Sequence, residues 1–338
     1  MNKIYLLLFV LFLNSCDAQD KKDITFKKFP VEQALVTKKL FTADVTSPYH
    51  MMLFNDSLLL IRHDESTTRH HFSSYSLHSK QKVRDLLPAG RKAGESLSFL
   101  SFGILGDQLW VLDLLKAAII FVSIKDLDSV TEELPFQNTN YYRIQPLTKH
   151  TFICSGDHDS NYLLEKVDLN KGKIEETYFP YPENFPRTQK EAFESFLYKH
   201  PTQNKYFLAA RYADYLQYID LDAGTKKQIF GPEGFGPNLK LAKTAEGKEF
   251  MSINKETRFG YVRGQTTEKY IYLLISGNFR EKEDSELGKS IFVFDWDGNE
   301  KKRINLENGI VDFVVSSNDS TIYVFNPETR SIESGNLY

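Results

Sequence analysis

The sequence has no marked excess of charge of either sign. Its 42 Lys and Arg residues oppose 45 Asp and Glu residues, which gives a formal net charge of −3. The basic residues are scattered along the chain instead of forming a stripe, so no nucleic-acid partner is expected. Helical periodicity is weak throughout. Only residues 189–197 could form a helical turn or two, and the second half of that range favours a strand.

Several enzyme motifs are also missing. The chain has no sialidase-type Asp box and no G-x-S-x-G elbow, and the Trp-Asp letters within Asp295–Asn299 lack the upstream Gly-His of a WD repeat. The strands expected to line a central channel carry few acids, chiefly Glu194 and Asp312. These absences disfavour an enzyme, and we predict no catalytic residues, no metal ligands and no cofactor. A metal-dependent hydrolase or lactonase-like enzyme remains the alternative.

Cysteine is scarce, with Cys16 and Cys154 as the two examples. Lys3 and the apolar run 4–13 form a signal segment that is too short to span a bilayer, which takes roughly 20 residues. The segment 13–16, Leu-Asn-Ser-Cys, resembles a lipobox, which implies cleavage before Cys16 and lipidation of its sulfur. An ordinary secretory signal with an incidental Cys is the alternative.

The predicted organisation is a lipoprotein signal peptide at 1–15, a polar tether at 16–23 and a folded domain at 24–338. The protein would sit in the cell envelope, anchored to a membrane through Cys16, with the leaflet left open. With Cys16 lipidated, no internal disulfide is expected, and Cys154 is predicted to be a buried, inert thiol.

Aromatic residues are plentiful, at 14% of the chain, and favour β structure. One hairpin pattern, clearest at Tyr215–Phe230 with Asp222–Thr225 as its turn, recurs along the sequence. Corresponding strands return every 40 to 50 residues or so, a period typical of propeller blades. We identify six units, at 49–87, 99–134, 141–179, 193–230, 259–306 and 311–337.

The sixth unit is one strand short, whereas spare strand-like segments precede the first unit at Ile24–Phe29 and Ala34–Phe41. A ring of blades must close, because an open strand edge invites association. We therefore predict an all-β fold, a six-bladed β-propeller of four-stranded antiparallel blades closed by an N-terminal strand. An open pair of sheets is the competing architecture.

Several segments resemble the TolB-like six-bladed propeller lipoproteins of Bacteroidota. They are the lipobox, the run 56–60, the segment Gly90–Glu95 and the run Asp107–Asp113. Members of that family commonly carry G-x-G-P-G-E-F between blades one and two. This sequence keeps Gly90, Gly94 and Glu95 but lacks the Pro and the following Phe. The resemblance implies the fold and the envelope address, and it implies no common activity.

Loops between second and third strands, and loops between blades, share one face of a propeller. Insertions at 232–256 and 277–289 add to these loops, and such insertions often build the binding surface. We predict a binding module for a glycan, a peptide or an envelope protein. A structural subunit of an envelope assembly is a weaker possibility. The candidate binding residues at the channel mouth are Arg62, His63, Asp113, Asp157, His158, Arg211 and Arg263.

Overall fold

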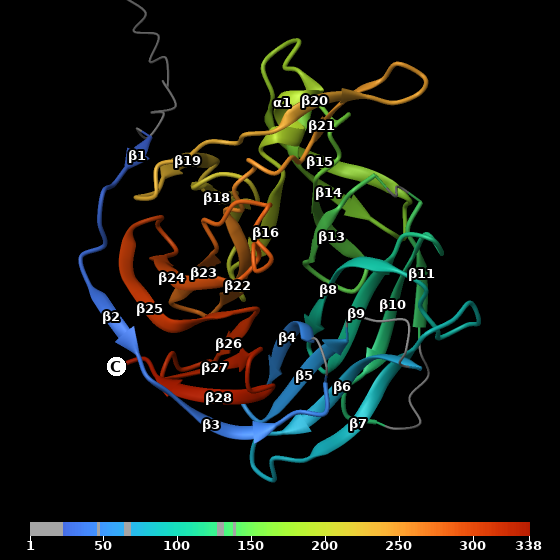
Figure 1. Cartoon of the computed structure of the whole chain (residues 1–338). Coiled ribbons are helices and arrows are strands. Elements are labelled where there is room, and N and C mark those ends of the chain that lie inside the picture. The colour runs from blue at the N-terminus through green and yellow to red at the C-terminus, as the bar shows by residue number, and fades with distance from the viewer. Residues whose placement is uncertain (1–22, 46–47, 64–68, 127–131, 138–139) are drawn as a thin grey trace, which may run out of the picture.

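The computed structural model of the chain describes residues 23–338, except 46–47, 64–68, 127–131 and 138–139. Six antiparallel sheets are arranged in a ring, each a blade whose first strand lies at the centre (Figure 1). The predicted six-bladed propeller is confirmed. The signal peptide, Cys16 and nearly all of the tether lie outside the described residues. In the described part, no helix has the length and apolar character needed to cross a membrane.

Blades one to three each contain four strands in chain order. Blade one comprises β4 (Pro48–Phe54), β5 (Leu58–His63), β6 (His70–Ser76) and β7 (Lys82–Pro88). Blade two comprises β8 (Phe99–Leu105), β9 (Gln108–Asp113), β10 (Ala118–Ser123) and β11 (Glu132–Pro135). Blade three comprises β12 (Arg143–Pro146), β13 (Thr151–Ser155), β14 (Tyr162–Asp168) and β15 (Lys173–Pro180).

Blades four to six take additional strands from the N-terminal segment. Blade four contains β16 (Ser195–Lys199), β17 (Lys205–Ala210), β18 (Tyr215–Asp220) and β19 (Thr225–Phe230). Blade five contains β22 (Tyr261–Thr266), β23 (Tyr270–Ile275), β24 (Gly288–Asp295) and β25 (Glu300–Ile310). Blade six contains β26 (Phe313–Val315), β27 (Thr321–Asn326) and β28 (Ser331–Asn336).

The N-terminal segment runs around the outside of blades four, five and six in that order (Figure 1). β1 (Ile24–Thr25) pairs with β19 and β2 (Glu32–Leu35) pairs with β25, both in parallel. β3 (Thr37–Thr42) pairs antiparallel with β28 and completes blade six. The expected closure by an N-terminal strand is therefore correct, and β1 and β2 are additional fifth strands that the sequence reading did not anticipate.

The core lies between the blades. Buried apolar side chains from each blade meet those of the next, so the middle strands are covered on both faces. Strand β10 shows the pattern, because its first four residues, 118–121, are all buried. Continuous burial explains why these strands read as apolar runs instead of alternating with polar residues. Cys154 lies fully buried between blades two and three, where burial raises the pKa of its thiol.

Two segments depart from the regular blade pattern near the seam of blades three and four. The helix α1 (Arg187–Ala192) begins after Pro186 and ends early, because Ser195 already pairs with Ala210 as the start of β16. The 232–256 insertion forms a two-stranded hairpin of β20 (Lys240–Lys243) and β21 (Glu249–Ser252). This hairpin, defined here as residues 239–253, lies against α1 (Figure 1).

Candidate functional site

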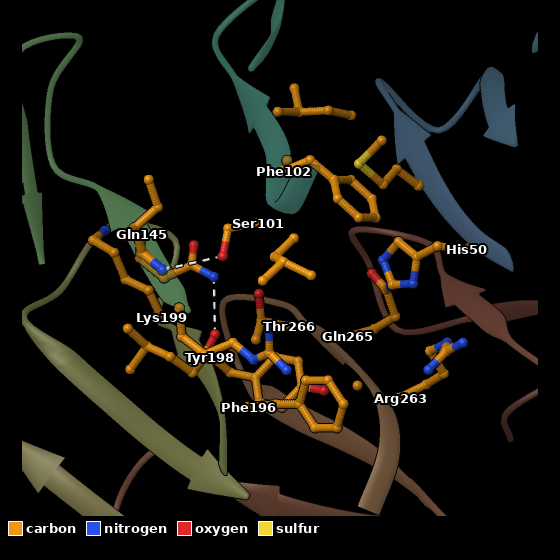
Figure 2. Close-up of a pocket in the computed structure, with 18 of the residues that line it drawn as sticks. His50, Ser101, Phe102, Gln145, Phe196, Tyr198, Lys199, Arg263, Gln265 and Thr266 are labelled. Atoms are coloured by element: carbon orange, nitrogen blue, oxygen red, sulfur yellow. Dashed lines mark hydrogen bonds between the residues drawn. The ribbon is translucent and has the colours of Figure 1, made fainter. Parts of the chain in front are cut away.

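A cavity of about 760 Å³ occupies the middle of the ring. Its wall comes from the first strands of blades one to five, namely β4, β8, β12, β16 and β22. Figure 2 shows side chains from these strands arranged around the space, among them His50, Phe102, Gln145, Tyr198 and Arg263. Five segments far apart in the sequence thus meet at one place, which we call the channel cavity.

The wall of the channel cavity is rich in positive charge. Five fixed cations contribute to it: Arg62, Arg143, Lys199, Arg211 and Arg263. Within the described part of the chain, Glu286 is the one carboxylate in this lining. Two further carboxylates lie just behind the wall, Glu194 and Asp312, so the cations still outnumber the acids nearby. A charge imbalance of this kind in a concave site attracts anions.

Aromatic rings hold the guanidinium groups in place. The Arg62 guanidinium lies over the Phe99 ring at 4.3 Å and the Phe102 ring at 5.1 Å from the ring centroids. Arg143 lies over Phe196 at 4.7 Å, and Arg211 approaches the same ring at 5.7 Å. Stacking on a ring holds the plane of a guanidinium, whose fork of N–H groups matches the geometry of carboxylates and phosphates.

Glu194 orients two of these arginines. Its carboxylate accepts a hydrogen bond from Arg211 Nη1 at 2.9 Å and lies 3.5 Å from Arg143 Nη2. Burial alone would raise the pKa of the Glu194 carboxyl, but the Arg211 and Arg143 guanidinium groups lower it below its ordinary value. Glu194 therefore stays ionised at neutral pH and joins blade three to blade four at the cavity wall.

Hydrogen bonds between first strands fix the shape of the wall. Ser101 Oγ donates to Tyr142 O at 2.8 Å, and Gln145 Nε2 donates to Leu197 O at 2.9 Å. Gln265 Nε2 reaches Met51 O at 3.4 Å, across the short first strand of blade six. The cavity is thus part of a rigid scaffold and keeps its form without a ligand.

A second, smaller pocket of about 460 Å³ adjoins the channel cavity, and three residues line both: Leu100, Arg143 and Arg211. Its roof comes from the hairpin, and α1 supplies Arg187 and Glu191. His158 also lines it, with Nδ1 4.0 Å from Glu191 Oε1. Burial lowers the pKa of His158 although Glu194 and Glu191 act in the opposite direction, so the ring is mostly neutral at pH 7. We call this space the hairpin pocket.

The predicted site residues fall into two groups. Arg62, Arg211 and Arg263 line the channel cavity, and His158 lines the hairpin pocket. The other three residues lie in neither space. They are His63, Asp113 and Asp157.

Each of those three has a local role. His63 Nε2 contacts Ser73 Oγ at 2.7 Å, and burial lowers the pKa of the ring. Asp113 is fully buried and accepts hydrogen bonds from Leu97 N and Leu115 N, so it orders the loops around it. Asp157 accepts from Asp159 N at 2.9 Å in its own turn.

The sequence reading overlooked several residues of the wall. His50, Arg143, Gln145, Phe196, Tyr198 and Gln265 all line the channel cavity. They occupy alternate positions of first strands, as in Arg143 and Gln145 or Phe196 and Tyr198. Because side chains alternate across a strand, this spacing places one face of each first strand in the channel. That alternation was the available signal.

A catalytic metal centre finds no support in the described residues. Among residues 23–338 outside the four internal gaps, no three His, Cys, Asp or Glu side chains converge closely enough to hold an ion. The Asp157-His158-Asp159 triplet illustrates why. His158 faces the hairpin pocket, whereas Asp159 is exposed and pairs with Arg187. The site is therefore organised around cations and rings.

Comparison with solved structures finds propellers of low sequence identity. A member of the DUF4221 family from Bacteroides vulgatus superposes with a TM-score of 0.56 at 10% identity, covering 89% of this chain and 97% of that one. A putative exported protein from Bacteroides fragilis gives a TM-score of 0.53 at 12% identity, covering 93% and 99%. At this identity the similarity concerns the fold. The comparison with curated proteins finds no match.

A comparison with protein families gives a more specific result. The family described as TolB-like 6-blade propeller-like matches residues 25–318, nearly the whole folded domain. The match begins at β1 and ends within blade six, so it includes the N-terminal segment that closes the ring. It agrees with the resemblance seen in the sequence and with the observed architecture. The chain belongs to the TolB-like six-bladed propeller family.

Proposed function

We propose that this protein is a binding module outside the cytoplasm, and that its channel cavity receives an anionic group of a peptide or glycan partner. The observation that carries the proposal is the lining of the cavity, where five cations and several aromatic rings accompany one carboxylate. Propellers commonly serve as scaffolds for such sites, because loops and first strands from many blades converge on one axis.

The chemistry of the wall favours anions over neutral ligands. Hydrogen bonds from guanidinium groups to carboxylate or phosphate are shorter and roughly twice as strong as those between neutral groups. The residue Arg263 is only 9% exposed, so its charge acts in a region with little water to screen it. Binding is favoured over the metal-dependent hydrolase alternative because, in the described residues, no three His, Cys, Asp or Glu side chains are grouped so that they could hold a metal ion.

Replacing Arg263 with Met should weaken binding of small anions while leaving the fold intact. We expect glucuronate to lose about tenfold in affinity or more, because a hydrogen bond to a charged group contributes roughly 1.5–3 kcal/mol. Isothermal titration calorimetry would measure this, with circular dichroism as the check on folding. Arg280→Met is the matched control, since Arg280 is exposed and lines neither cavity. Equal affinities for the wild type and both variants would disprove the assignment.

The envelope location is part of the proposal and is supported by the lipobox at 13–16. Cys16→Ala should move the protein from the membrane fraction to the soluble fraction and abolish metabolic labelling with a fatty acid. Cys154→Ala is the control, because Cys154 is buried far from the terminus in blade three. Unchanged fractionation of the Cys16 variant, without lipid label on the wild type, would show that the segment is an ordinary secretory signal.

A further inference from the structure

The hairpin pocket has an apolar side formed largely by the hairpin. Leu239, Phe250, Met251 and Ile253 of the hairpin line it, opposite Leu100 of β8. Leu100 and Ile253 remain 44% and 42% exposed although they border a space of about 460 Å³. Large apolar side chains gathered around a hollow, with charged groups at its edge, are typical of a ligand subsite.

The pocket is formed before any ligand arrives, because the hairpin is tied at two points. Met251 N donates to Glu191 Oε2 of α1 at 2.7 Å, and Thr257 Oγ1 donates to Asn238 O at 2.6 Å at the base of the hairpin. Glu191 is itself fixed by Arg187 Nε at 2.8 Å. The apolar roof is therefore held at a set position above Arg143 and Arg211.

The two spaces are continuous in chemistry as well as in position. Arg143 and Arg211 belong to both linings, so an anion held by either guanidinium lies at the boundary between them. A group attached to that anion would extend either into the basic channel or beneath the hairpin. The second direction places it against the apolar side chains of the hairpin, whose burial favours binding.

We infer that the partner is a peptide in which a carboxylate adjoins an apolar side chain, with the carboxylate at Arg143 and Arg211 and the side chain in the hairpin pocket. This inference rests on the proposed function of the channel cavity. Among the peptide and glycan partners considered, the apolar roof favours the peptide, because roof side chains such as Leu239 and Ile253 offer the hydroxyl groups of a sugar no hydrogen-bond partner.

Four small probes test the inference by calorimetry on the folded domain. N-acetylphenylalanine should bind about tenfold more tightly than N-acetylglycine, because the phenyl ring adds buried apolar area. N-acetylphenylalanine amide, which lacks the carboxylate, should bind much more weakly than the acid. Glucuronate should bind no better than N-acetylglycine. If glucuronate matches or exceeds N-acetylphenylalanine, the partner is an acidic glycan and the peptide inference is wrong.

A hairpin variant separates the two proposals. Phe250→Ser should remove the advantage of N-acetylphenylalanine over N-acetylglycine, and Ile253→Ser should reduce that advantage. Leu241→Ser is the control, because Leu241 is 56% exposed on the same hairpin and lines neither space. If N-acetylglycine binds and the ring adds nothing, the inference fails and the proposed function stands. If none of the acids binds, the proposed function itself fails.

Discussion

A chain lacking residues 24–42 should lose the cooperative unfolding transition of the complete domain. The deletion removes β3, so blade six keeps three strands and β28 becomes an open edge. It also removes four buried side chains, Phe26, Phe29, Leu35 and Phe41. At roughly 1.5–3 kcal/mol each, their burial contributes about 6–12 kcal/mol, which is comparable with the whole stability of a typical domain.

Thermal unfolding followed by circular dichroism would measure this loss, and size-exclusion chromatography would show association through the open edge. Two point variants refine the test within the same segment. Phe41→Ala should cost about 3–5 kcal/mol, because Phe41 is buried and stacks on Tyr75 of blade one with ring centroids 5.7 Å apart. Val36→Ala should change stability by less than about 0.5 kcal/mol, since Val36 is 77% exposed. A deleted chain with an unchanged melting temperature would show that the ring closes without β3.

The closure of the ring could be predicted because it follows from counting strands, whereas the path of the N-terminal segment could not. Six repeats with one strand missing require a donor, and the strand-like run 34–41 contains most of β3. β1 has two residues and β2 has four, so neither carries a readable pattern. Their parallel pairing with β19 and β25 depends on the outer edges that blades four and five present after folding.

In the candidate site, too, some residues could be predicted from the sequence, whereas the positions of others depend on the assembled fold. Arg62, Arg211 and Arg263 were predicted to lie in loops at the channel mouth, and all three line the channel cavity, Arg263 from strand β22. Asp113 occupies a similar place at the end of β9, but its carboxylate accepts hydrogen bonds from the backbone N–H groups of neighbouring loops. Sequence position does not determine whether such a side chain faces the channel or binds the backbone of a loop, because the outcome depends on which loop folds over the strand end.

Arg143 was overlooked for a different reason. The sequence reading searched loops for charged residues, and Arg143 is the first residue of an inner strand. Its role becomes visible only when β12 and β16 lie side by side and Glu194 bridges it to Arg211. The hairpin pocket likewise requires an insertion from between blades four and five to reach α1, which lies between blades three and four. Contacts between distant insertions have no local signature.

Replacing Asp312 with Ala should destabilise the domain by about 2–4 kcal/mol. Asp312 is fully buried, and its carboxylate accepts hydrogen bonds from Met51 N at 2.5 Å and Phe313 N at 2.8 Å, with His50 Nδ1 at 3.1 Å. It therefore joins the first strands of blades six and one at the centre of the ring, whereas β3 closes the seam at the rim. Truncation would leave buried donors without an acceptor, at a cost of roughly 1–3 kcal/mol each.

Asp297→Ala provides the matched control, because Asp297 is 69% exposed. Its Oδ1 lies 3.0 Å from Lys205 Nζ, and an exposed ion pair of this kind should contribute less than about 1 kcal/mol. Both carboxylates have polar partners, but Asp312 is buried and Asp297 is exposed. Chemical denaturation of the two variants would measure how much the burial changes the cost in stability. Asp312 does not line the channel cavity, so the Asp312 variant should keep its affinity for N-acetylglycine wherever it remains folded. Loss of binding without loss of stability would instead place Asp312 in the ligand site and show that the inner seam is held by the β strands alone.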